Sequence, residues 1–101
     1  MSDFMEIGQY QLENLMKNGV RFSYFDLSDT NATAQHPLLK GSQQIGHDAV
    51  VKHIGDLGLS KDAPIVLICQ NGTKSLEVAR KLSENSYLNV YVIEGGHASL
   101  T

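Results

Sequence analysis

The sequence is poor in cysteine and proline and has no tryptophan. Its one cysteine, Cys69, excludes an intramolecular disulfide, a Cys-x-x-Cys redox pair and a cysteine-rich zinc site. The longest apolar run, Ile65 to Cys69, is far shorter than the roughly 20 residues that span a bilayer, and the first residues lack the pattern of a secretory signal. We therefore expect a cytoplasmic protein with no membrane partner.

Basic residues are also few. Eight Lys and Arg stand against eleven Asp and Glu, which gives a net charge of −3. A protein that binds the phosphate backbone of nucleic acid needs a basic surface, so nucleic acid is disfavoured as a partner. No two histidines stand three or four positions apart, the usual spacing of metal ligands on a helix. We expect neither a metal nor a cofactor. The histidines are His36, His47, His53 and His97.

The 101 residues, 42% of them hydrophobic, are enough for one folded domain, which we expect to span residues 1–101. Hydrophobic periodicity alternates between strand and helix, a pattern typical of an α/β fold with a parallel sheet and helices on both faces. The continuous β-branched segment 65–69 is predicted to be the central strand. Strands are predicted at 20–27, 65–69 and 90–93 with a very short one at 44–45, helices at 9–18, at 47–57 and from about 74 to 84, and a loop at 31–44.

Cys69 stands at the predicted end of the central strand, directly before a glycine-containing turn into a helix. Ligands of open parallel sheets bind at the carboxyl ends of the strands. A loop from strand to helix can aim successive backbone N–H groups inward, and these groups, with the helix N-terminus, stabilise an anion such as a thiolate. Lys74 can add a positive charge. Alternatively, Cys69 is a small hydrophobic residue of the core and Lys74 an ordinary solvated side chain.

The loop Cys69-x-x-Gly72-x-Lys74-Ser75 resembles the active-site loop Cys-x-x-Gly-x-Arg-Ser of the rhodanese-like sulfurtransferases. The resemblance extends over nearly the whole chain. Phe25-Asp26-Leu27-Ser28 resembles the Asp-Val-Arg strand end of that family, and the segment from His36-Pro37 to Gly41-Ser42 resembles its His-Ile-Pro-Gly-Ala segment. Ile93-Glu94-Gly95-Gly96 resembles its Leu-x-Gly-Gly turn.

This resemblance implies a three-layer α/β/α fold with a mostly parallel sheet of four to five strands. It also implies that Cys69 takes a sulfane sulfur from a small anionic donor, such as thiosulfate or a persulfide, and holds it as a persulfide. The sulfur then passes to a thiophilic acceptor, either cyanide or a thiol, including a protein thiol. One cysteine suffices, because the acceptor attacks the outer sulfur and no resolving cysteine is needed. The loop residues implied to hold the anion are Gln70, Asn71, Gly72, Thr73, Lys74 and Ser75.

Four further residues are candidates for the wall of the site: Asp26, His36, Gly95 and Gly96. Each also has a simpler interpretation, since Asp is common as a turn cap and a Gly-Gly pair marks a tight turn with positive φ. The aromatic residues of the periodic segments are predicted to be core, without a functional role. They are Tyr10, Phe22, Tyr24, Phe25, Tyr87 and Tyr91.

The chain departs from the family pattern at three positions. Ser28 and Lys74 stand where the family has Arg, and Leu100 stands near the place of a common Trp. A second hypothesis is therefore a catalytically weak rhodanese-homology domain that binds a protein or relays sulfur. Arsenate or phosphate-ester chemistry is disfavoured, because related phosphatases use a loop one residue longer that ends in Arg, and Ser75 holds that place here.

Overall fold

Five parallel strands form a single sheet in the order β1-β5-β4-β2-β3. The computed structural model describes residues 4–28, 37–39, 41–70 and 72–100. The strands are β1 (Phe4–Ile7), β2 (Ser23–Asp26), β3 (Gln43–Gln44), β4 (Ile65–Ile68) and β5 (Val90–Ile93). All four residues of β4 are buried, and β4 lies between β5 and β2. The prediction that this segment is the central strand is confirmed.

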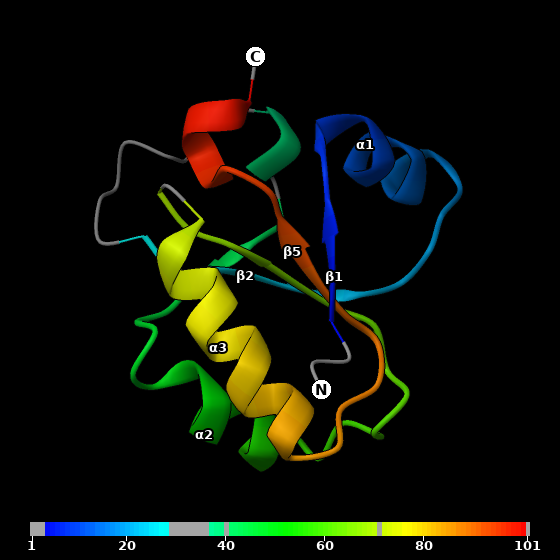
Figure 1. Cartoon of the computed structure of the whole chain (residues 1–101). Coiled ribbons are helices and arrows are strands. Elements are labelled where there is room, and N and C mark those ends of the chain that lie inside the picture. The colour runs from blue at the N-terminus through cyan, green and yellow to red at the C-terminus, as the bar shows by residue number, and fades with distance from the viewer. Residues whose placement is uncertain (1–3, 29–36, 40, 71, 101) are drawn as a thin grey trace.

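Helices cover both faces of the sheet, as Figure 1 shows, with α1 on one side and α2 and α3 on the other. Two short 3-10 helices, η2 and η3, complete the described elements. The predicted three-layer α/β/α architecture is confirmed. The helices are α1 (Gln9–Lys17), α2 (Val50–Leu57), α3 (Thr73–Glu84), η2 (Pro37–Leu39) and η3 (Gly96–Ser99).

The core is divided by the sheet into two apolar clusters, and β4 contributes to both. Ile65 and Leu67 pack with residues of α2 and α3, whereas Val66 and Ile68 pack on the other face with Leu12 of α1. This division follows from the period of two along a strand. Each fully buried aliphatic side chain contributes about 1.5–3 kcal/mol. The packing of β4 on both faces therefore fixes the position at which the strand ends, immediately before Cys69.

Several predicted boundaries differ from the structure. The strand predicted at 20–27 is only Ser23–Asp26, and Val20 is 40% exposed. The strand predicted at 65–69 ends at Ile68, the helix predicted at 47–57 begins at Val50, and the short strand predicted at 44–45 is Gln43–Gln44. Of the loop predicted at 31–44, residues 31–36 and 40 lie outside the described residues.

Strand β1 was not predicted from the sequence. Among the described residues it is an edge strand that pairs with β5 alone, and its middle residues Met5 and Glu6 are exposed. Only its two end residues, Phe4 and Ile7, pack in the apolar clusters, so the run of buried β-formers that identifies a central strand is missing. Backbone pairing with Val90–Ile93 therefore defines this strand more than its side chains do.

One aromatic prediction was wrong. Tyr10 is 73% exposed on α1, so it does not belong to the core. The other aromatic residues are buried or half-buried, and all of them pack in the two apolar clusters. In the described part of the chain, no helix has the length and apolar character needed to cross a membrane.

Candidate active site

Cys69 lies at the carboxyl end of β4, and its sulfur accepts hydrogen bonds from two backbone N–H groups. The Gly72 N–H donates to Sγ at 3.0 Å and the Ser75 N–H at 3.4 Å. The Ser75 hydroxyl oxygen lies 3.3 Å from the same sulfur and donates to the Gly72 carbonyl at 3.2 Å. Cys69 is 1% exposed and Ser75 is fully buried. The loop therefore closes around the sulfur and aims two backbone N–H donors at it.

Gly72 makes this closed loop possible. Its φ of +92° is one that side-chain-bearing residues rarely adopt, and a Cβ there would lie 3.2 Å from the Gly95 nitrogen. Gly72 is also the N-cap of α3 and offers no side-chain cap to the helix. The N–H groups of the N-cap Gly72 and of Ser75 in the first turn of α3 point to the sulfur, and the helix dipole adds positive potential at this end.

The remaining described residues of the loop form its rim. Gln70, Thr73 and Lys74 are exposed, and Lys74 is the one basic residue in this stretch of sequence. Its charge stands in the first turn of α3, where a cation is unfavourable unless an anion is near. Asn71 lies outside the described residues. The rim is therefore polar and open to solvent, whereas the sulfur beneath it is buried.

A glycine pair forms the opposite side of the loop. Gly95 and Gly96 have φ values of +76° and +60°. The α-carbon of Gly96 packs so closely on the Cys69 carbonyl that a Cβ would overlap the oxygen. The N–H groups of His97 and Ala98 donate to the carbonyls of Cys69 and Gln70, at 2.8 Å and 3.2 Å. The end of β5 and η3 are thereby bound to the start of the loop.

Asp26, the last residue of β2, is 2% exposed and has two partners. Its Oδ1 accepts from the Ser28 N–H at 3.0 Å, and His97 Nε2 lies 3.0 Å from the same oxygen. A carboxylate oxygen accepts, so this contact is a hydrogen bond in the tautomer that carries the proton on His97 Nε2. This pair was not predicted from the sequence. The available signal was that His97 follows directly on the glycine turn that the resemblance places near Cys69. His36, the remaining candidate wall residue, lies outside the described residues.

Ser28 is 5% exposed, and its hydroxyl has no hydrogen-bond partner among the described residues. Tyr24, two residues before Asp26, donates its hydroxyl to the Leu38 carbonyl at 3.0 Å. Burial, and secondarily the negative charge of Asp26, raises the pKa of Tyr24 well above its usual range. The end of β2 therefore carries a buried negative charge beside a phenol that stays neutral.

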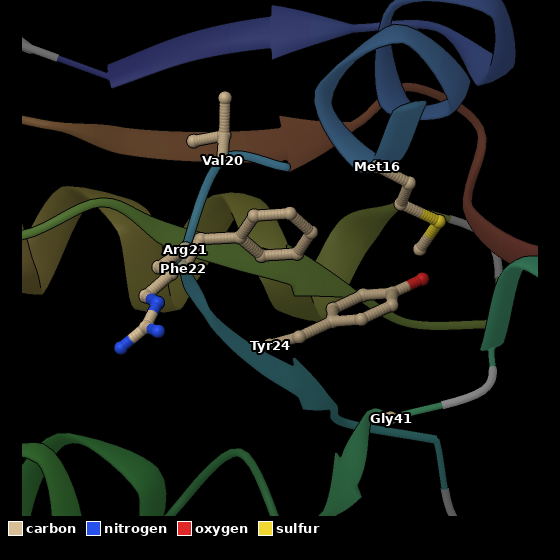
Figure 2. Close-up of a pocket in the computed structure, with 6 residues that line it drawn as sticks. All are labelled: Met16, Val20, Arg21, Phe22, Tyr24 and Gly41. Atoms are coloured by element: carbon tan, nitrogen blue, oxygen red, sulfur yellow. The ribbon is translucent and has the colours of Figure 1, made fainter. Parts of the chain in front are cut away.

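The structure also contains a cavity of about 380 Å³ away from Cys69. In Figure 2 the rings of Phe22 and Tyr24 and the thioether of Met16 surround it, while the Arg21 guanidinium points away from the rings. Four of its residues lie at or just before the start of β2, with Met16 from α1 and Gly41 before β3, whereas Cys69 follows the carboxyl end of β4. Among the described residues, no three His, Cys, Asp or Glu side chains group as metal ligands would.

Comparisons with known proteins agree with this geometry. The family model "Rhodanese-like domain" matches residues 9–100. The chain is 32% identical over 97 residues to the thiosulfate sulfurtransferase GlpE of Pseudomonas paraeruginosa, covering 95% of this chain and 84% of that protein. A rhodanese-like domain protein from Staphylococcus aureus has a similar structure, with a TM-score of 0.76, 19% identity, and coverage of 94% and 89% of the two chains. A rhodanese homologue from Thermus thermophilus gives a TM-score of 0.66, 23% identity, and coverage of 94% and 99%.

Proposed function

The chain belongs to the rhodanese-like domain family, and on that premise we propose that it is a sulfurtransferase that carries a sulfane sulfur on Cys69 as a persulfide. The observation that carries this proposal is the pair of backbone N–H groups, of Gly72 and Ser75, that donate to the Cys69 sulfur. Such donors stabilise a sulfur anion without any particular side chain. The proposal extends to thiosulfate as donor because the relative from Pseudomonas paraeruginosa carries that name.

The reaction needs two displacements at sulfur. In the first, the Cys69 thiolate attacks the outer sulfur of thiosulfate, a new S–S bond forms, and sulfite leaves with the electron pair of the broken S–S bond. In the second, cyanide or a thiolate attacks the outer sulfur of the Cys69 persulfide, and the Cys69 thiolate leaves with the electron pair. The two forms of the enzyme between these steps, the Cys69 thiolate and the Cys69 persulfide, both carry a negative charge inside the same loop. The loop can therefore stabilise the thiolate and the persulfide in turn.

The burial of Cys69 determines how a donor approaches. Because the side chain is 1% exposed, the donor must come over the rim made by Gln70, Thr73 and Lys74. Lys74 is in a position to attract an anionic donor to this rim, a role in binding and not in bond breaking. Asp26 acts on the loop indirectly, through its contact with His97 of η3. Gly95 and Gly96 act through the backbone hydrogen bonds that η3 donates to the start of the loop.

Intact-protein mass spectrometry tests the proposal. The wild-type protein and Cys69→Ser are incubated with thiosulfate, and separately with glutathione persulfide, and then with cyanide. The expected result is an adduct of one sulfur that forms on the wild type, is removed by cyanide, and is missing from Cys69→Ser. Circular dichroism of both proteins controls for folding. If a folded wild-type protein gains no sulfur from either donor, the proposal is wrong, and the domain is a binding module.

A further inference from the structure

Two residues separated by 71 positions in sequence meet beside the Cys69 loop. His97 Nε2 and Asp26 Oδ1 are 3.0 Å apart, and their side chains are 14% and 3% exposed. Asp26 ends β2, and His97 lies in η3. This hydrogen bond is therefore a largely buried link between the sheet and the segment that follows β5.

The Asp26 end of this link is rigid. The residue pairs with Ile68 of β4 in the parallel sheet, and its carboxylate is also held by the Ser28 N–H. The strand partner Ile68 directly precedes Cys69 in the chain. Asp26 therefore offers His97 an acceptor whose position is fixed relative to the start of the Cys69 loop.

The His97 end of the link holds the loop itself. The His97 N–H donates to the Cys69 carbonyl at 2.8 Å, and the neighbouring Ala98 N–H donates to the Gln70 carbonyl at 3.2 Å. A trans peptide unit is planar, with its C=O and N–H pointing in opposite directions. When the Cys69 carbonyl is held toward η3, the Gln70 N–H is turned away from η3. The orientation of η3 thus determines the orientation of the first peptide unit of the loop.

We propose that Asp26 and His97 form a positioning pair, in which their hydrogen bond fixes η3 and η3 in turn fixes the backbone of the Cys69 loop. The proposal rests on the proposed function and deepens it, because it assigns a role at the same site to a side chain that does not touch the sulfur. A displaced loop donates less well to the Cys69 sulfur and stabilises its anion less. His97 acts through the loop backbone and is not itself a catalytic residue.

Three single variants, one double variant and one control test this pair. His97→Phe keeps a planar ring but loses the donor, whereas the side-chain amide of His97→Gln can again donate to Asp26. Asp26→Ala removes the acceptor, and the double variant closes a mutant cycle. Asn89→Ala is the control, since it also removes one side-chain hydrogen bond, to the Asp62 carbonyl, at the opposite edge of the sheet.

The main readout is the rate at which iodoacetamide alkylates Cys69 near pH 7, measured beside the rate of sulfur uptake from thiosulfate. We expect His97→Phe and Asp26→Ala to lower both rates about tenfold or more. The double variant should be no slower than the single ones, His97→Gln should recover most of the loss, and Asn89→Ala should match the wild type. Equal rates in His97→Phe and wild type, or no recovery in His97→Gln, would overturn the proposal.

Failure of the proposed function and failure of the positioning pair give different results in these experiments. Alkylation needs no sulfur transfer, so a wild-type protein that takes up no sulfur contradicts the proposed function while the alkylation rates still decide the role of the pair. If His97→Phe does not fold, nitrogen NMR of the wild-type histidine rings replaces it. A proton on His97 Nε2 in a hydrogen bond supports the pair, and a ring protonated only on Nδ1 overturns it.

Discussion

Gly96 packs its α-carbon directly against the carbonyl group of Cys69. A Cβ at Gly96 would overlap the carbonyl oxygen and would lie 2.9 Å from the carbonyl carbons of both Cys69 and Gln70. All three atoms are backbone and cannot rotate away as a side-chain end can. The turn after β5 and the loop after β4 therefore fit only if this position carries no side chain.

The first prediction concerns Gly96→Ala. The substitution combines a backbone clash with a φ of +60°, so we expect a loss of at least about 3 kcal/mol in the free energy of unfolding, or no folding. Urea denaturation measures this loss. In any fraction that folds, alkylation of Cys69 should be slower, because the loop must move to make room.

Gly58→Ala is the matched control for this substitution. Gly58 has a φ of +68°, close to that of Gly96, but a Cβ there would meet nothing within 4 Å. Only the cost of the left-handed backbone remains, about 1 kcal/mol. If both variants lose the same free energy, the close approach of Gly96 to Cys69 contributes nothing to stability.

The second prediction concerns Ser75→Ala. The Ser75 hydroxyl is fully buried, donates to the Gly72 carbonyl and lies 3.3 Å from the Cys69 sulfur. Its removal should cost about 1 kcal/mol of stability and slow sulfur uptake about fivefold, because the Ser75 N–H remains while the hydroxyl is lost. Ser42→Ala, which removes a hydroxyl bonded to the Leu39 carbonyl, should leave sulfur uptake unchanged. An unchanged rate in Ser75→Ala would assign this hydroxyl to loop structure alone.

The central elements of the fold could be predicted because their signals are local. The run from Ile65 to Ile68 identifies a strand buried on both faces, and the structure shows it as the central strand. Strand β1 was missed because its pairing partner β5 is remote in sequence. Its two adjacent exposed residues, Met5 and Glu6, also break the alternation of buried and exposed side chains that is typical of a strand. Tyr10 was misplaced because aromatic residues were assigned to the core as a class, although on α1 it lies on the side opposite the buried Leu12.

At the candidate site too, contacts between residues close in sequence could be predicted, and contacts between remote residues could not. The order Cys69, Gly72, Ser75 along the chain is enough to predict a loop that encloses a sulfur, since all its donors are local. The contact between Asp26 and His97 depends on where β2 and η3 end in space, and spacing along the chain gives no information on that. That the Ser28 hydroxyl has no partner among the described residues also became visible only in the folded chain.

The third prediction concerns stability at high pH. The pKa of Tyr24 is raised in the folded chain, mainly by burial, above the value near 10 of an unfolded chain. Below pH 10 both states keep the proton, and the contribution of Tyr24 to stability is complete. Above pH 10 the unfolded chain releases the proton and the folded chain keeps it, so stability falls by up to about 1.4 kcal/mol per pH unit. Urea unfolding between pH 8 and about pH 11 measures this slope.

Tyr24→Phe should flatten that slope. The variant also loses the hydrogen bond to the Leu38 carbonyl, so the comparison concerns the change of stability with pH and not its absolute value. Tyr10→Phe, at a side chain that is 73% exposed, should keep the slope of the wild type. If Tyr24→Phe loses stability above pH 10 as steeply as the wild type, another group causes the alkaline transition.

The last prediction separates binding from chemistry at the rim. Lys74 is exposed in the first turn of α3, where its charge opposes the helix dipole, so Lys74→Gln should leave stability unchanged or raise it slightly. If Lys74 attracts the anionic donor, the same variant should raise KM for thiosulfate about threefold with little change in kcat, and this difference should shrink as salt screens the charge. Lys81→Gln, in the last turn of the same helix, removes an equal charge at the opposite end and should leave KM unchanged. Equal effects of the two substitutions would mean that thiosulfate responds to the net charge of the protein. An effect confined to Lys74 would mean that a cation was retained at an unfavourable helix position because an anion binds beside it.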